Sequence, residues 1–278
     1  MTSKLSPPEY LIALAGVLML SVSTAMANGF SVLVSPPRFE LEGQPGETLR
    51  NHVEINNPNN HSISLELRTA DWDMNESGAT TFYPPELQPG SCRPWARIER
   101  HRIQLPAQLT KRYRFQIDIP ADAPAGECRL ALLLEAPPED AVITQADTLN
   151  IPVQGRLAIV MYVAVGAASP DLELQEVVLE EINGILSPVA IVHNRGNAHA
   201  RTAGFVDGKD ANGLRLEFAV ASLPILPGQT RSVPLRRADQ EDSEAEPFVP
   251  PLELDGSIEW ETGKQTLRAR VGQAALTD

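Results

Sequence analysis

The sequence lacks the short motifs by which most enzymes are recognised. It contains no glycine-rich phosphate-binding loop, no H-E-x-x-H and no G-x-S-x-G. Two of its histidines, His193 and His199, are close in sequence, but they bracket a turn-rich stretch and have no third ligand of the kind that zinc requires. We therefore expect a protein that is not an enzyme and that uses no cofactor or metal.

Cysteine is nearly absent, since Cys92 and Cys128 are the only two in the chain. Two thiols offer too few ligands for a structural metal site. An even pair in an oxidising compartment favours a disulfide, so we expect a Cys92–Cys128 bond. Two separate thiols are the alternative.

Long apolar runs are missing beyond the N-terminus. The run Tyr10 to Val22 is short for a membrane span, and Ala25-Met26-Ala27 after it has the small-residue pattern of a cleavage site. We interpret residues 1–27 as a cleaved secretory signal peptide, with an uncleaved N-terminal anchor as the alternative. The mature protein is then expected to be soluble outside the cytoplasm, with no membrane insertion after cleavage.

Positive charge is also in deficit. The chain has 23 Lys and Arg residues against 36 Asp and Glu residues, a formal net charge of −13, which argues against nucleic acid as a partner. Proline and glycine, by contrast, are abundant and evenly spread, and no long amphipathic helix pattern occurs. This combination favours many short strands joined by turns.

Alternating apolar residues mark the strands of an all-β protein. Ile63, Leu65 and Leu67 alternate in one run, and Tyr113 to Ile119 in another. Seven such strands at regular spacing predict an immunoglobulin-like β-sandwich over residues 28–165. In this prediction Trp95 to Ile103 forms one strand and Asn75 to Gln88 a loose connection.

The second half of the sequence repeats this organisation. A short stretch at 166–170, GAASP, predicts a hinge. Alternating strands continue after it and end in a hairpin around Thr262-Gly263-Lys264. We expect a second immunoglobulin-like sandwich over residues 171–278, because about 250 mature residues suit two domains better than one.

The most informative stretch is Thr148 to Tyr162. Its first half places Leu149, Ile151 and Val153 on one face of an extended strand, and its second half is apolar almost throughout. Pro152 lacks an N–H and is tolerated at a sheet edge rather than in a central ladder. An apolar ridge on an open edge is an aggregation hazard unless a partner pairs with it.

Three segments resemble the PapD-like periplasmic chaperones of pilus assembly. Ser35-Pro36-Pro37-Arg38-Phe39 is similar to the family segment whose arginine holds the C-terminal carboxylate of a pilus subunit, which implies that role for Arg38. Glu135-Ala136-Pro137-Pro138 resembles the Glu-x-Pro-Pro end of the family's sixth strand, and residues 149–154 its seventh-strand motif. The family lends that strand to incomplete subunits.

The sequence departs from the family in two respects. The lysine that usually accompanies the arginine is expected by spacing at Ala158, which has no charge. Arg156, two residues earlier on the same face, is the substitute candidate, and a solvated surface arginine is the alternative for it. The chain is also acidic, whereas family members tend to be basic.

The resemblance implies a periplasmic chaperone from a Gram-negative cell. Its partner would be a secreted pilus or fimbrial subunit, and an outer-membrane usher is a further possible partner. Subunit binding would involve Leu149, Ile151 and Val153 by donor-strand complementation, with Arg38 and Arg156 as the cations. The alternative function is a structural or adhesive surface protein built from two immunoglobulin-like domains.

Overall fold

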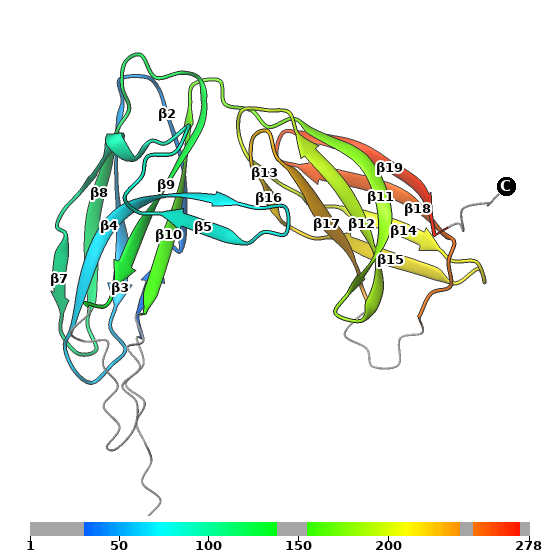
Figure 1. The fold of residues 1–278 in the computed structure, drawn as a ribbon, viewed down its shortest axis with the longest axis horizontal. Coiled ribbons are helices and arrows are strands. Elements are labelled where there is room, and N and C mark those ends of the chain that lie inside the picture. The colour runs from blue at the N-terminus through cyan, green and yellow to red at the C-terminus, as the bar shows by residue number, and fades with distance from the viewer. Residues whose placement is uncertain (1–30, 138–154, 240–246, 273–278) are drawn as a thin grey trace, which may run out of the picture.

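The computed structural model describes residues 31–137, 155–239 and 247–272. The described chain folds into two β-sandwiches joined after residue 165 (Figure 1). The predicted all-β fold with two immunoglobulin-like sandwiches is confirmed, because every regular element except one short 3-10 helix is a strand. The predicted signal peptide, residues 1–27, lies outside the described residues.

The first sandwich packs two sheets face to face. In one sheet the strand order is β1, β3, β8 and β6. The other has the order β2, β10, β9, β4 and β5, with β7 paired to the first part of β4. The strands are β1 (Leu33–Ser35), β2 (Arg38–Gly43), β3 (Thr48–Asn56), β4 (Ile63–Met74), β5 (Thr80–Tyr83), β6 (Ala96–Ile98), β7 (Arg102–Leu105), β8 (Thr110–Asp118), β9 (Gly126–Glu135) and β10 (Arg156–Val165).

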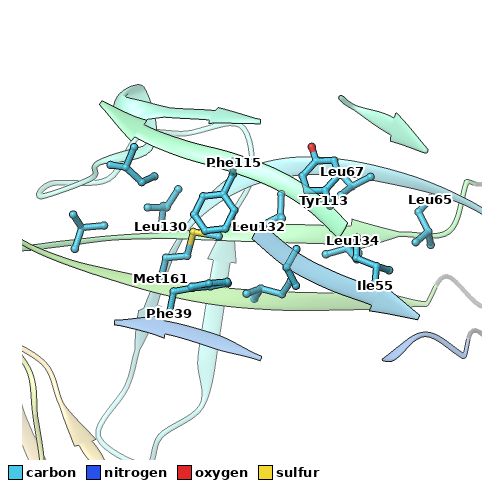
Figure 2. Packing of buried hydrophobic residues seen from close by; sticks show 14 of the residues in the cluster. Phe39, Ile55, Leu65, Leu67, Tyr113, Phe115, Leu130, Leu132, Leu134 and Met161 are labelled. Carbon is cyan, nitrogen blue, oxygen red and sulfur yellow. The ribbon is translucent and has the colours of Figure 1, made fainter. Parts of the chain in front are cut away.

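Alternating side chains of the two sheets fill the space between them. Tyr113 and Phe115 of β8 face Leu130, Leu132 and Leu134 of β9 across the core (Figure 2). These are the alternating positions that the sequence pattern predicts, because successive strand residues point to opposite faces. The predicted disulfide is confirmed as well.

The disulfide joins two neighbouring segments of this sandwich. Cys92 precedes the 3-10 helix η1 (Arg93–Trp95), and Cys128 lies near the start of β9. Their Cα atoms are 5.5 Å apart, within the range that a disulfide spans. The bond therefore attaches the loop before β6 to the sheet that contains β10.

Two predictions about single strands are wrong. Trp95 to Ile103 is not one strand, since β6 pairs with β8 in one sheet and β7 pairs with β4 in the other. The segment from Asn75 to Gln88 is not a loose connection, because β5 pairs with the last residues of β4. This β4–β5 arm, residues 71–83, extends from the first sandwich to the second (Figure 1).

The second sandwich is built from a sheet that changes layers at β17. Thr230–Pro234 of β17 pair with β12, and Leu235–Arg237 pair with β15. The strand order is β11, β12, β17, β15, β14, β18 and β19, with a small β13–β16 pair beside it. The strands are β11 (Leu172–Ile182), β12 (Ile185–Asn194), β13 (Ala200–Arg201), β14 (Phe205–Lys209), β15 (Arg215–Val220), β16 (Pro224–Ile225), β17 (Thr230–Arg237), β18 (Leu252–Trp260) and β19 (Gly263–Val271).

Candidate binding site at the open edge of β10

Strand β10 is paired along its whole length on one side and along only part of its length on the other. It pairs with β9 along its whole length, from Arg156 to Val165. It pairs with β2 only from Val160, which lies opposite Arg38, to Val165. Among the described residues, no strand covers the other edge of Arg156 to Ile159. This stretch of β10 is the open edge.

The open edge exists because the N-terminal segment changes sheets. β1 pairs with β3 in one layer, and β2 pairs with β10 in the other. Pro36 and Pro37 lie between them, and neither has a backbone N–H to contribute to a ladder. The strand beside β10 therefore begins only at Arg38.

The open edge continues directly toward the predicted ridge. Leu149, Ile151 and Val153 fall within residues 138–154, which lie outside the described residues. Their role in subunit binding therefore stays a prediction. The described chain resumes at Gly155, whose carbonyl accepts a hydrogen bond from the N–H of Ala136, and β10 begins at the next residue, Arg156.

The two faces of β10 serve different packing surfaces. Ile159, Met161 and Val163 enter the core of the first sandwich. Ala158, Val160 and Tyr162 lie on the opposite face, in a smaller apolar cluster with Trp72 and Leu133. The second domain contributes Leu226 to that cluster, where it is fully buried. This part of the strand is therefore covered on both faces, although Ala158 and Val160 are only half-buried.

Arg156 lies at the start of the open edge and is held by a buried carboxylate. Its Nε contacts Oε1 of Glu135, the residue opposite it on β9. Arg68 donates to the same carboxylate, with Nε 2.7 Å from Oε2 and Nη2 2.8 Å from Oε1. The hydrogen bonds from Arg68 hold the pKa of Glu135 below its usual range. Arg156 is therefore a partner of Glu135 in this structure.

The structure does not bring Arg38 and Arg156 together. Arg38 pairs with Val160, four residues further along β10, which corresponds to about 13 Å at roughly 3.3 Å per residue. Arg38 instead contacts Glu40 on its own strand, with Nε 2.8 Å from Oε1. The two predicted cations thus mark opposite ends of the open edge.

The second domain adds a polar cluster beside Arg38. His199 Nδ1 lies 2.5 Å from Oε2 of Glu127, and its ring stacks on Tyr162 with centroids 3.8 Å apart. Arg201 Nε lies 3.5 Å from Oε1 of Glu40. Burial raises the pKa of Tyr162, so its hydroxyl stays protonated at neutral pH. Glu127, Tyr162 and Glu40 belong to the first domain, and the cluster therefore spans the domain boundary.

Sequence reasoning missed this cluster. Its only signal in the sequence is the proximity of His193 and His199, a pair with too few partners for a zinc site. In the structure His199 faces glutamates from another domain, and the described residues contain no group of His, Cys, Asp or Glu side chains arranged to hold a metal ion. Contacts between domains leave no period in the sequence, so no pattern could have paired His199 with Glu127.

Comparisons with known proteins find only distant similarities among solved structures. No family model matches the chain, and no curated protein matches it either. Among solved structures, a chaperone–tip adhesin complex of CFA/I fimbriae is similar, with 12% identity over 88% of this chain and 100% of that chain and a TM-score of 0.46. The Acinetobacter baumannii CsuC–CsuE chaperone–tip adhesion subunit complex has 12% identity over 87% and 98%, and a TM-score of 0.44. The Pseudomonas aeruginosa CupB2 chaperone has 11% identity over 86% and 100%, and a TM-score of 0.44.

These similarities are too distant to assign a function. Identities near 12% combined with TM-scores below 0.5 leave the assignment to the geometry of this chain itself. Within the described ranges, the structure has no helix with the length and apolar character that crossing a bilayer requires.

Proposed function

We propose that this protein is a periplasmic chaperone that binds secreted pilus or fimbrial subunits by pairing the open edge of β10 with an incomplete subunit. The observation that carries the proposal is that, in the part of the chain that the structure describes, no strand pairs with the second edge of Arg156 to Ile159. An open edge presents backbone donors and acceptors to an extended segment, which is the basis of strand addition. The motif resemblance in residues 35–39 and 135–138 supports the same family of functions.

The register of β2 limits how a bound strand can lie. A strand paired with the open edge would occupy the track that β2 occupies from Val160 onward. It must therefore end near Arg38, because β2 closes the track there. A cation at this point favours a C-terminal carboxylate over an N-terminal amine. Arg38 lies opposite Val160, at the end of the open edge toward which β10 runs, so a bound strand whose C-terminus reaches Arg38 is parallel to β10.

The apolar ridge would supply most of the binding energy. Leu149, Ile151 and Val153 would enter a groove in the subunit, and burying three such side chains yields roughly 5–9 kcal/mol before ordering costs. The proposal requires no nucleotide, so release would follow from exchange with a competing strand. An outer-membrane usher is the expected second partner, and the periplasm is the compartment in which these encounters would occur.

The proposal is tested by removing the ridge. The triple variant Leu149→Ser, Ile151→Ser, Val153→Ser is co-expressed with the secreted subunit encoded by the neighbouring gene, and co-purification from periplasmic extracts is measured. We expect the complex to be lost, since three apolar side chains no longer enter the subunit.

A matched control changes the other face of the same segment. Asn150→Ser with Gln154→Ser alters two polar residues without touching the ridge, and we expect it to retain the complex. Circular dichroism checks that both variants are folded. Full complex formation by the folded ridge variant would falsify strand donation.

A further inference from the structure

The carboxylate of Glu40 is a point of convergence for the two domains. Arg38 of the first domain contacts Oε1 of Glu40 at 2.8 Å. The second domain contributes Nε of Arg201 at 3.5 Å and Nε2 of His199 at 3.8 Å from the same oxygen. Two arginines from different domains thus face one glutamate at the end of the open edge.

This arrangement leaves a donor unsatisfied. Nε of Arg201 is buried and makes no hydrogen bond, although it lies within ion-pair distance of Glu40. A buried N–H without an acceptor costs free energy that an additional acceptor would recover. A carboxylate placed beside Glu40, or in its place, offers such an acceptor in a charge-assisted bond.

A further arginine of the second domain, Arg231, adds positive charge at this boundary. Arg231 of β17 is almost fully buried, and its Nε also lacks a hydrogen-bond partner. Burial lowers the pKa of Arg231, and the nearby charge of Arg201 lowers it further. Arg201 and Arg231 thus add two positive charges from the second domain at this boundary, and positive charge of this kind favours an anion.

Glu40 itself is easily displaced. The side chains of Arg38 and Glu40 are 44% and 40% exposed, and exposed ion pairs of this kind contribute little to stability. The Arg38–Glu40 pair therefore holds Glu40 weakly, and Arg201 at 3.5 Å and His199 at 3.8 Å are both too distant for a good hydrogen bond to Glu40. A competing carboxylate that brings its own strand pairing along β10 would outcompete it.

We propose that Arg201 supplies the second cation of the carboxylate site, and that Glu40 occupies this site in the free chain until the C-terminal carboxylate of a bound strand displaces it. The proposal rests on strand donation by β10. Arg201 of the second domain then provides the positive charge that the family's lysine would provide at the position of Ala158. Arg156 remains paired with Glu135 at the other end of the open edge. The ligand chemistry is a peptide C-terminus.

The test uses a minimal probe of that chemistry. N-acetylglycine presents a peptide C-terminal carboxylate, and N-acetylglycinamide is its uncharged counterpart. Each is titrated into the ¹⁵N-labelled mature chain, and the Nε–H resonances of the arginines are followed by NMR. We expect saturable shifts at Arg38 and Arg201 with the acid and no such shifts with the amide.

Three variants separate the roles. Arg201→Gln is expected to weaken binding of the acid about tenfold, the size of one charge-assisted hydrogen bond. Glu40→Gln is expected to tighten it several-fold, because the internal competitor is gone. Arg50→Gln changes an exposed arginine in the opposite sheet and is expected to leave the affinity unaltered.

The inference is overturned if the acid and the amide bind equally, or if Arg201→Gln leaves the affinity for the acid unchanged. Arg201→Lys guards against a purely structural effect, because it keeps the charge and loses the Nε donor; its affinity should fall between wild type and Arg201→Gln. Neither outcome touches strand donation, which the ridge variant tests through co-purification.

Discussion

The imidazole of His199 stacks on the phenol ring of Tyr162 with an interplanar angle of 22°, and this contact joins the second domain to β10. His199 also bonds to Glu127, whose side chain is almost completely buried. The strand proposed to receive a subunit is thus in direct contact with the domain that follows it.

His199→Phe keeps an aromatic ring stacked on Tyr162 but removes the ring nitrogen that contacts the buried Glu127 carboxylate. We expect it to destabilise the protein by about 1–3 kcal/mol, because that carboxylate loses its imidazole partner. Urea unfolding of the purified chain measures the change. Adding Glu127→Leu should recover most of the loss, since no buried charge is then left unpaired. If the double variant is less stable than His199→Phe alone, the stated cause is wrong.

Gly78→Ala is expected to cost more stability than Gly90→Ala. Both glycines have a positive φ, +90° and +74°, which any other residue adopts at a cost. A Cβ at Gly78 would collide with the guanidinium of Arg231, whereas a Cβ at Gly90 would meet no atom within 4 Å. We expect an additional loss of about 1 kcal/mol for Gly78→Ala, measured by thermal unfolding. Equal losses of stability would show that the Arg231 guanidinium moves away from the new Cβ without a cost, and would contradict the prediction.

Glu135→Gln is expected to flatten the acid limb of the stability profile. The folded-state pKa of Glu135 is lowered, chiefly by Arg68, so its contribution is complete above the unfolded pKa of about 4.3 and disappears as the pH falls through the folded value. At neutral pH we expect a loss of about 1–3 kcal/mol, reduced from a fully buried pair because both arginines are partly exposed. Urea unfolding at a series of pH values should show the gap between variant and wild type closing below that pH. A constant gap contradicts the assignment.

Removing the disulfide is expected to destabilise the first domain by about 3–4 kcal/mol. Cys92 and Cys128 are separated by 36 residues, and the chain-entropy model gives this range for a loop of that length. The double variant Cys92→Ala, Cys128→Ala is compared with wild type by urea unfolding, with and without a reducing agent. Mass spectrometry of the non-reduced wild type provides the control, and free thiols there would exclude the bond.

Local patterns in the sequence were sufficient to predict the fold class and many of the individual strands. The alternation at Tyr113 and Phe115 fixes which side chains enter the core, because a strand has a period of two. The Cys92–Cys128 bond followed from an even pair in a secreted chain. Such features depend on neighbouring residues or on composition, and both can be read without a structure.

The features that were missed depend on contacts between distant segments. The break between β6 and β7 reflects pairing with β8 and β4 in opposite sheets, and the segment itself carries no Gly or Pro that would announce it. The approach of Arg201 to Glu40 depends on how the second domain packs on the first. Neither has a periodicity, so only the folded chain reveals them.

The β4–β5 arm has a mechanical consequence for the domain boundary. Gln229 Nε2 donates to Oδ1 of Asp73 at 3.0 Å, so the arm meets the second domain at a place other than the linker between β10 and β11. Domains joined by a linker alone can rotate freely about it, and each further point of contact restricts that rotation. Together with the linker and the His199–Tyr162 stack, the arm gives the two domains three separate points of contact, so a rotation about the linker that moves Arg201 away from Glu40 must also break the Gln229–Asp73 hydrogen bond.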